Sequence, residues 1–221
     1  MKETEDIMKD NIIKKLGEQY VLEKRDMGDL SHIHKGMYDF ICDAYEIKDI
    51  GSLFFINMKA MFGLMKMETS VITPLNKDLS FCNLDIVEAM GNETYMFEMY
   101  KSAINDPDLS VFDDIRKKYE YLTDYKTSER WYDAVKLSPS IAKKGKKIGT
   151  DGDKLLTECL DTYLKLLKDA PKCDPDKKKT EVRKYVDRLI AEGGAAVDSM
   201  NKIIGAEKTA KLIREFMYHI N

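Results

Sequence analysis

The chain has 221 residues, of which 43% are apolar and 34% are charged, a mixture typical of a folded globular domain. Its length favours one domain over two. With 36 basic and 39 acidic residues, the formal net charge is -3. This balance excludes a general nucleic-acid-binding protein, because such proteins carry a basic excess.

The beginning of the sequence and its apolar runs indicate the expected location. The segment MKETEDIMKD carries acids where a signal peptide would be basic. No run approaches the roughly 18 apolar residues that cross a bilayer. We therefore expect a cytoplasmic protein with no membrane partner.

Cysteine and histidine spacing gives no clear metal or disulfide site. The four cysteines are far apart and include no CxxC pair, so free thiols are expected rather than disulfides or zinc ligands. His32 and His34 would share one side of an extended chain, which is compatible with a metal clip. A surface loop beside Gly36 is the favoured interpretation, and no metal site is predicted.

Two helices are expected within residues 1–50. Apolar residues recur at helical spacing from about Glu5 to Glu23, with Lys and Glu between them. Residues 24–29 interrupt this pattern. A shorter helix is expected over residues 35–47, where the apolar stripe consists of Met37, Phe40, Ile41 and Tyr45.

From residue 52 to residue 104 the pattern is that of a β-sheet. Along one segment, Met65, Met67, Thr69 and Val71 alternate with Lys66, Glu68, Ser70 and Ile72, which places the two sets on opposite faces of a strand. Gly63 is expected as the turn before this strand and Pro74 as its end. Gly91 separates two further apolar runs and predicts a hairpin, although a helix over residues 85–90 is an alternative. Strands joined by short turns indicate an antiparallel sheet.

The remainder of the chain, residues 106–221, is expected to be mainly helical. Asp106 is placed as the N-cap of a helix that begins at Pro107, and residues 126–152 are irregular. Gly193-Gly194 interrupts the later helices and Gly205 ends one of them. The sequence thus predicts a single α+β domain over residues 1–221, arranged as a three-layer α/β/α sandwich with a central antiparallel sheet.

No familiar catalytic signature is present. The sequence has no phosphate-binding glycine loop, no nucleophile elbow and no HExxH motif. Composition and spacing alone therefore predict an α+β domain without assigning a reaction to it.

A series of short motifs resembles the ferredoxin-dependent bilin reductases. Residues 67–74 (METSVITP) resemble a family strand that ends in proline, and Asp78-Leu79 resembles the family's Asp-Leu-Pro loop, with Ser80 in place of the proline. Residues 84–87 (LDIV) resemble the strand with an Asp-Ile/Leu-Val core. Segments 130–135 and 185–217 follow in the family's order, so the resemblance covers about residues 52–221.

The resemblance implies a function. The family reduces linear tetrapyrroles without a bound cofactor, using single electrons from ferredoxin and protons from protein groups. It implies a bilin-like planar ligand between the sheet and the C-terminal helices, and ferredoxin as a partner. Asp85 matches the family's central aspartate, and desolvation under a flat ligand would raise its pKa and suit it to proton donation. A solvent-facing or turn-capping aspartate is the structural alternative.

The other family positions are only partly retained. The family's imidazole position matches Thr69, which does not titrate usefully, so Glu68 beside it is expected as a second acid. An acid of the last helical pair would fall near Gly193-Gly194, where Asp198 is the nearest candidate. Met67 and Phe97 are expected with Thr69 and Asp198 to line the ligand site, with core packing as the alternative.

Three hypotheses follow. The first is a bilin reductase-like oxidoreductase that uses Asp85 and Glu68. The second is a non-catalytic ligand-binding or protein-interaction module on the same fold, which the missing imidazole favours. The third is a helical regulatory protein whose Met-rich segment forms a partner groove.

Overall fold

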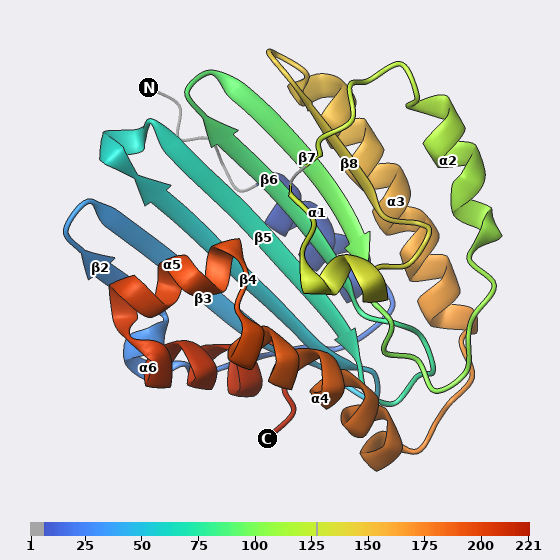
Figure 1. The fold of residues 1–221 in the computed structure, drawn as a ribbon. Helices are drawn as coiled ribbons and strands as arrows, with labels where there is room; N and C mark the ends of the chain where they lie inside the picture. The colour runs from blue at the N-terminus through green and yellow to red at the C-terminus, as the bar shows by residue number, and fades with distance from the viewer. Residues whose placement is uncertain (1–6, 127) are drawn as a thin grey trace.

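The computed structural model describes residues 7–126 and 128–221 and consists of one antiparallel sheet between two helical layers (Figure 1). The sheet has eight strands in the order β1-β3-β4-β5-β6-β7-β8, with β2 also paired to β3. The strands are β1 (Leu22–Arg25), β2 (His32–Lys35), β3 (Tyr38–Ile47), β4 (Gly51–Ala60), β5 (Met65–Pro74), β6 (Cys82–Ala89), β7 (Asn92–Met99) and β8 (Ile141–Gly145). The predicted α+β sandwich with a central antiparallel sheet is confirmed.

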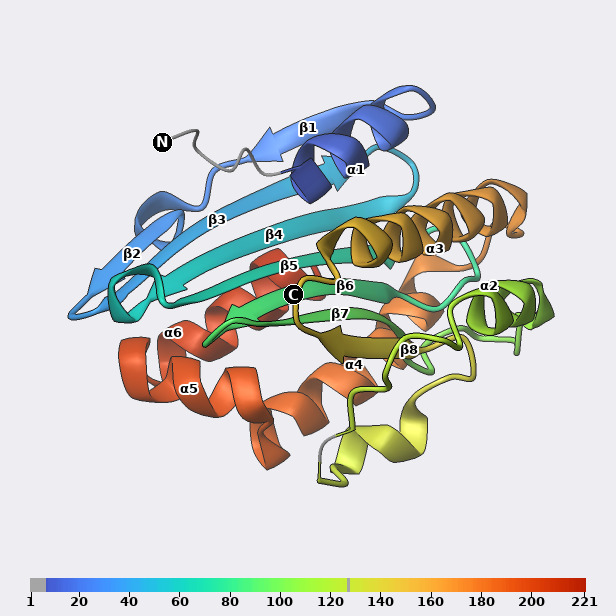
Figure 2. The same cartoon turned by 90° about the horizontal axis from the view of Figure 1, so that it is seen from above.

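Helices cover both faces of the sheet (Figure 2). One face packs against α1 (Ile7–Gly17), α2 (Asp113–Lys118) and α3 (Gly149–Asp169), and we call it the α3 face. The other packs against α4 (Pro175–Glu192), α5 (Ala195–Ile204), α6 (Ala206–Lys211) and the π-helical η5 (Leu212–Met217), and we call it the α4 face. Short 3₁₀ segments complete the chain: η1 (Gly28–Leu30), η2 (Met61–Gly63), η3 (Ser110–Phe112) and η4 (Trp131–Val135).

The turn residues predicted from the sequence are correct in the middle of the sheet. Gly63 lies in the η2 turn between β4 and β5, with a φ of 87° that suits glycine. Pro74 is the last residue of β5. Residues 82–89 form a strand and Gly91 lies in the hairpin that follows, so the helical alternative for residues 85–90 is wrong.

Of the two helices expected within residues 1–50, the first ends earlier than predicted, at Gly17, and the second is wrong. The predicted second helix, residues 35–47, is mostly β3, which pairs with β1, β2 and β4. Phe40 belongs to the core on the α4 face, while Ile47 belongs to the core on the α3 face. Burial from both sides gave this strand apolar residues whose spacing mimics a helix. The first predicted helix began at Glu5, which lies outside the described residues.

Two further boundaries differ from the expectation. Pro107 does not begin a helix, since the nearest helical segments are η3 and α2 and Asp106 caps neither of them. Residues 126–152 are less irregular than predicted, because β8 adds a strand beside β7 and α3 begins at Gly149. Non-local pairing produces β8, and a lysine-rich local pattern does not reveal it.

Three smaller features concern the predictions about membrane spans, cysteines and histidines. In the part of the chain that the structure describes, no helix has the length and apolar character to cross a bilayer. All four cysteines are free, and Cys42, Cys82 and Cys159 are buried. His32 and His34 lie on β2 rather than in a loop, and both imidazoles contact Oδ1 of Asp39, at 2.8 and 3.3 Å.

Candidate functional site

The candidate site lies on the α4 face, around the middle of β5, β6 and β7. Thr69 on β5 pairs with Asp85 on β6, and Asp85 pairs with Met96 on β7. Because side chains alternate along a strand, Met67 points to the same face as Thr69. Met67 packs against the core beneath α4, so Thr69 and Asp85 lie on the α4 face.

Asp85 is the acid at the centre of this site. The Thr69 hydroxyl donates a hydrogen bond to Oδ1 of Asp85. Burial and the nearby charge of Glu98 raise the pKa of Asp85 to about 7, against the opposing effect of the Thr69 hydrogen bond. The carboxyl is thus poised between its protonated and ionised forms near neutral pH.

Glu98 is a second acid on the same face. It lies on β7, where its register partner is Asn83, two residues before Asp85. Its Oε2 accepts a hydrogen bond from the Tyr100 hydroxyl (2.6 Å) and its Oε1 accepts one from Nζ of Lys136 (2.7 Å). These contacts connect Glu98 to a phenol and an ammonium group, both proton carriers, next to Asp85.

The backbone explains why Lys136 reaches Glu98. Residues after η4 run antiparallel to the end of β7, with a bridge between Tyr100 and Lys136. Two backbone hydrogen bonds of 2.8 Å, Lys101 N to Val135 O and Leu137 N to Met99 O, hold this alignment. Lys136 also pairs with Asp133 at 3.0 Å, so two carboxylates hold the pKa of its ammonium group above the usual value against the opposing effect of burial.

A cluster of aromatic rings packs beside the acids. Tyr185 of α4 lies 4.9 Å from both Phe81 and Tyr100, measured between ring centroids, and 5.3 Å from Trp131. Tyr218, after η5, lies 5.0 Å from Phe81. Burial raises the pKa of the Tyr100, Tyr185 and Tyr218 hydroxyls, which therefore stay protonated over the physiological range. These buried rings pack against one another and form an apolar wall with hydroxyl groups beside the acids.

The break between α4 and α5 is tied to this wall. Nε1 of Trp131 donates a hydrogen bond of 2.8 Å to the carbonyl of Gly193, and Arg188 lies over the indole ring at 4.6 Å. Gly193 has a φ of 74°, so the chain turns there between the two helices. Asp198 is in the first turn of α5, exposed, with Oδ1 close to Gly193. It lies in the α4 layer, but no described contact joins it to Asp85.

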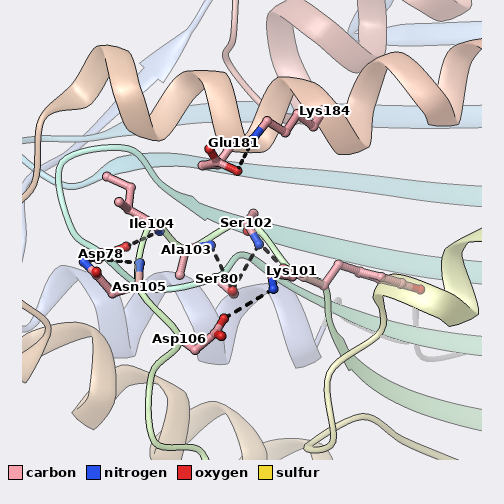
Figure 3. Close-up of polar contacts among 11 residues, drawn as sticks. Asp78, Ser80, Lys101, Ser102, Ala103, Ile104, Asn105, Asp106, Glu181 and Lys184 are labelled. Atoms are coloured by element: carbon pink, nitrogen blue, oxygen red, sulfur yellow. Dashed lines mark hydrogen bonds and ion pairs between the residues drawn. The ribbon is translucent and has the colours of Figure 1, made fainter.

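The loop that resembles the family's Asp-Leu-Pro segment organises the chain after β7 (Figure 3). Asp78 accepts hydrogen bonds from the backbone N–H groups of Ile104 (2.6 Å) and Asn105 (3.1 Å). Ser80, which stands in the proline position, accepts from the N–H groups of Ser102 (3.3 Å) and Ala103 (3.2 Å). The loop therefore holds the segment that directly follows Tyr100.

Lys178 joins α4 to the same loop. Its side chain is fully buried, and Nζ donates hydrogen bonds to the carbonyls of Leu79 (2.8 Å) and Ser102. Burial lowers the pKa of this lysine to about 8, with the charge of Asp78 opposing the shift. The contact fixes the start of α4, and with it the position of Tyr185 over the sheet.

Two of the predicted site residues lie on the other face. Glu68 is adjacent to Thr69 on β5 and pairs with Ile86, so it points toward the α3 face. Phe97 is fully buried in the core on that face, 5.2 Å from the ring of Phe112. The structure therefore brings together Asp85, Thr69 and Met67 and separates them from Glu68 and Phe97 by the thickness of the sheet.

Sequence reasoning did not select Glu98, Lys136 or Tyr185. Alternation along residues 94–100 groups Met96, Glu98 and Tyr100 on one side of a strand, which is the signal that was available. Joining that side to Asp85 requires the register of β6 and β7. Within the described residues, no group of three or more His, Cys, Asp or Glu side chains is placed to hold a metal ion.

Comparison with known proteins identifies the fold. No family model and no curated protein matches the sequence. Among solved structures, the chain is similar to phytochromobilin synthase from tomato, determined in complex with biliverdin, with a TM-score of 0.73 and 12% sequence identity. The match covers 96% of this chain and 82% of that one. The predicted resemblance to the ferredoxin-dependent bilin reductases is thus confirmed at the level of the fold.

Proposed function

We propose that the protein binds a linear tetrapyrrole on the α4 face and reduces it with electrons from an external one-electron donor of the ferredoxin type. The observation that carries the proposal is Asp85, whose pKa is raised to about 7 on an interior strand of a fold that is similar to a biliverdin-bound structure. Met67 and Asp198 are proposed to contact the ligand from the sheet and from α5. No bound cofactor is required, because both electrons come from the donor.

Asp85 is proposed as the proton donor. Reduction of one ligand double bond takes up two electrons and two protons, and a carboxyl with a pKa near 7 can release a proton to the reduced ligand and regain one from solvent. The hydrogen bond that Thr69 donates stabilises the ionised form of Asp85, so the carboxyl can lose its proton near neutral pH. Its hydroxyl orients the carboxyl and does not itself supply the proton.

Glu98 is proposed as the second acid, in place of Glu68. It lies on the same face as Asp85, and its charge contributes to the raised pKa of Asp85. Its contacts with Tyr100 and Lys136 offer a route for proton return. Glu68 points to the α3 face and is not proposed to take part.

The four free cysteines favour a reducing compartment, and the cytoplasm is the proposed location. The ferredoxin-type donor is proposed because the motifs resemble those of the ferredoxin-dependent bilin reductases and the fold is similar to that of phytochromobilin synthase.

A non-catalytic bilin carrier is the second candidate. The observation that favours it is Thr69, which stands beside Asp85 where the family has an imidazole. A carrier would use the same aromatic wall and would need no proton delivery.

Titration with biliverdin tests the binding step. Trp131 is the only tryptophan and packs against Tyr185, so saturable quenching of its fluorescence, together with a red-shifted bilin absorbance band, is expected at about 10 µM ligand or below. Absence of saturable binding would refute both candidate functions.

Addition of reduced ferredoxin under anaerobic conditions separates the two candidates. The wild-type protein should bleach the bilin band, Asp85→Asn should bind without bleaching, and Glu98→Gln should bleach more slowly. Glu68→Gln is the matched control on the opposite face and should behave like wild type. Binding with no bleaching by the wild-type protein would leave the carrier as the function.

A further inference from the structure

One end of the sheet carries exposed apolar side chains on adjacent turns. These are the β2–β3, β4–β5 and β6–β7 turns, which lie in a row along one edge of the molecule (Figure 1). Phe62 is 100% exposed, Met90 is 88% exposed and Leu64 is 66% exposed, with Met37 and Met61 about half exposed. Met90 N donates a 3.4 Å hydrogen bond to Leu64 O, so two of the tips are joined. We call this set the tip row.

Three residues of the tip row other than glycine adopt left-handed backbone conformations. Met61, Phe62 and Met90 have φ values of 52°, 58° and 49°, in the left-handed region that favours glycine. Residues other than glycine cost free energy there, and these three bury little in return. An exposed aromatic ring on a strained turn points to a partner that covers it.

The charges around the tip row indicate what that partner is. The turns hold Gly36-Met37, Met61–Leu64 and Met90-Gly91, and the neighbouring connection after β8 holds Lys146-Lys147-Ile148. None of these residues is acidic, although the chain as a whole has a net charge of -3. Both lysines of the connection are exposed, as are Lys35 and Lys59. Two acids flank the third turn: Glu88 is paired with Lys66 at 3.4 Å, and Glu93 is only partly exposed.

We propose that the tip row is a docking edge for an anionic lipid surface, with Phe62, Leu64 and Met90 inserted at the headgroup level and the lysines against lipid phosphates. Separate projecting tips suit a deformable bilayer, which closes around each side chain, better than a flat protein partner. Apolar insertion and attraction to anionic lipid add together in this kind of peripheral binding. The edge is distinct from the site around Asp85, and the inference does not rest on the proposed function. It departs from the expectation that the protein has no membrane partner.

Co-sedimentation with lipid vesicles tests the proposal on the full chain. The wild-type protein should sediment with vesicles containing phosphatidylserine and much less with pure phosphatidylcholine. The double variant Phe62→Ser/Met90→Ser should bind at least about tenfold more weakly, because it removes the two most exposed side chains of the row. Lys146→Gln/Lys147→Gln should weaken binding to phosphatidylserine and reduce its dependence on salt.

Val21→Ser/Val111→Ser is the matched control, since these side chains are 59% and 51% exposed away from the tip row. It should bind vesicles like wild type. The proposal is overturned if the wild-type protein does not sediment with anionic vesicles, or if the control loses as much binding as the tip variant. Equal binding to neutral and anionic vesicles would overturn it too. Sedimentation velocity without lipid tests whether a second copy of the chain covers the tip row instead. A dimer that Phe62→Ser abolishes would assign the tip row to that second copy and overturn the proposal.

Discussion

The Thr69 hydroxyl donates a hydrogen bond to the Asp85 carboxylate across the register pair that joins β5 to β6. This bond favours the ionised acid, whereas burial and the charge of Glu98 favour the protonated acid. The balance brings the pKa of Asp85 to about 7. The Thr69 hydroxyl therefore opposes the two influences that raise the pKa of Asp85.

Replacing Thr69 with valine should raise the pKa of Asp85 further. The variant keeps the shape of the side chain and removes the only one of the three influences that lowers the pKa, so a higher pKa is expected. Carbon-detected NMR titration of labelled aspartate measures it. Ser70→Ala is the control, because Ser70 is buried on the opposite face and its hydroxyl has no hydrogen-bond partner among the described residues. An unchanged or lower pKa in Thr69→Val would contradict the assigned role.

Asp85 should make the protein less stable as pH rises. Its folded pKa of about 7 lies above the unfolded value of 3.8, so between these values the folded state holds a proton that the unfolded state has released. Its stabilising contribution is complete below about pH 4 and is lost as pH rises through about 7. Asp85→Asn should remove this slope and raise the free energy of unfolding at pH 8 by about 1–4 kcal/mol.

Urea unfolding at several pH values measures this effect. Asp10→Asn, which changes an exposed carboxyl on α1, is the control and should retain the wild-type slope. A loss of stability in Asp85→Asn at pH 8 would show that the carboxylate is stabilised when ionised, against the expected direction.

The sequence predicted the middle of the fold better than its edges. Residues 65–74 alternate cleanly and end at a proline, so local pattern and tertiary pairing agree there. Along β3, apolar side chains enter both cores, and the alternation that identifies a strand disappears. Strand β8 depends on pairing with β7, which is distant in sequence. Both failures arise because non-local pairing, rather than local preference, determines these strands.

The candidate site was predicted in the same partial way. Asp85 and Thr69 could be found because a family resemblance marked them, and alternation along β5 already assigned Glu68 to the opposite side from Thr69. Glu98 was not found, because its proximity to Asp85 follows from the β6–β7 register. The position of Lys136 was harder still to predict from the sequence, because it lies in an irregular segment that pairs with the end of β7.

Lys178 should give the opposite pH dependence from Asp85. Its folded pKa of about 8 lies below the unfolded value of 10.5, so the unfolded state holds more protons between these values and stability rises with pH across that window. Lys178→Met should abolish the rise. It should also lower stability at pH 7 by about 2 kcal/mol, because the buried carbonyls of Leu79 and Ser102 lose their donor.

Thermal unfolding at pH 7 and pH 10 measures both effects. Lys177→Met is the matched control, an exposed lysine one position earlier on α4, and should leave both values near wild type. If Lys178→Met were more stable than wild type at pH 7, the cost of burying the charge would exceed the value of its two hydrogen bonds.

Gly193 should tolerate no side chain. Its φ of 74° strains any other residue, and a Cβ there would lie 2.3 Å from Oδ1 of Asp198. Gly205 provides the matched control, because its φ of 87° imposes similar strain while a Cβ would meet open space. Gly205→Ala should cost about 1 kcal/mol of stability, and Gly193→Ala about 2–4 kcal/mol, the difference being the clash that pushes α5 away.

Because Nε1 of Trp131 donates to the Gly193 carbonyl, the fluorescence of this single tryptophan should shift in Gly193→Ala and remain unchanged in Gly205→Ala. Equal losses of stability with no fluorescence difference would mean that Asp198 moves aside freely, and that the break between α4 and α5 is held by backbone conformation alone.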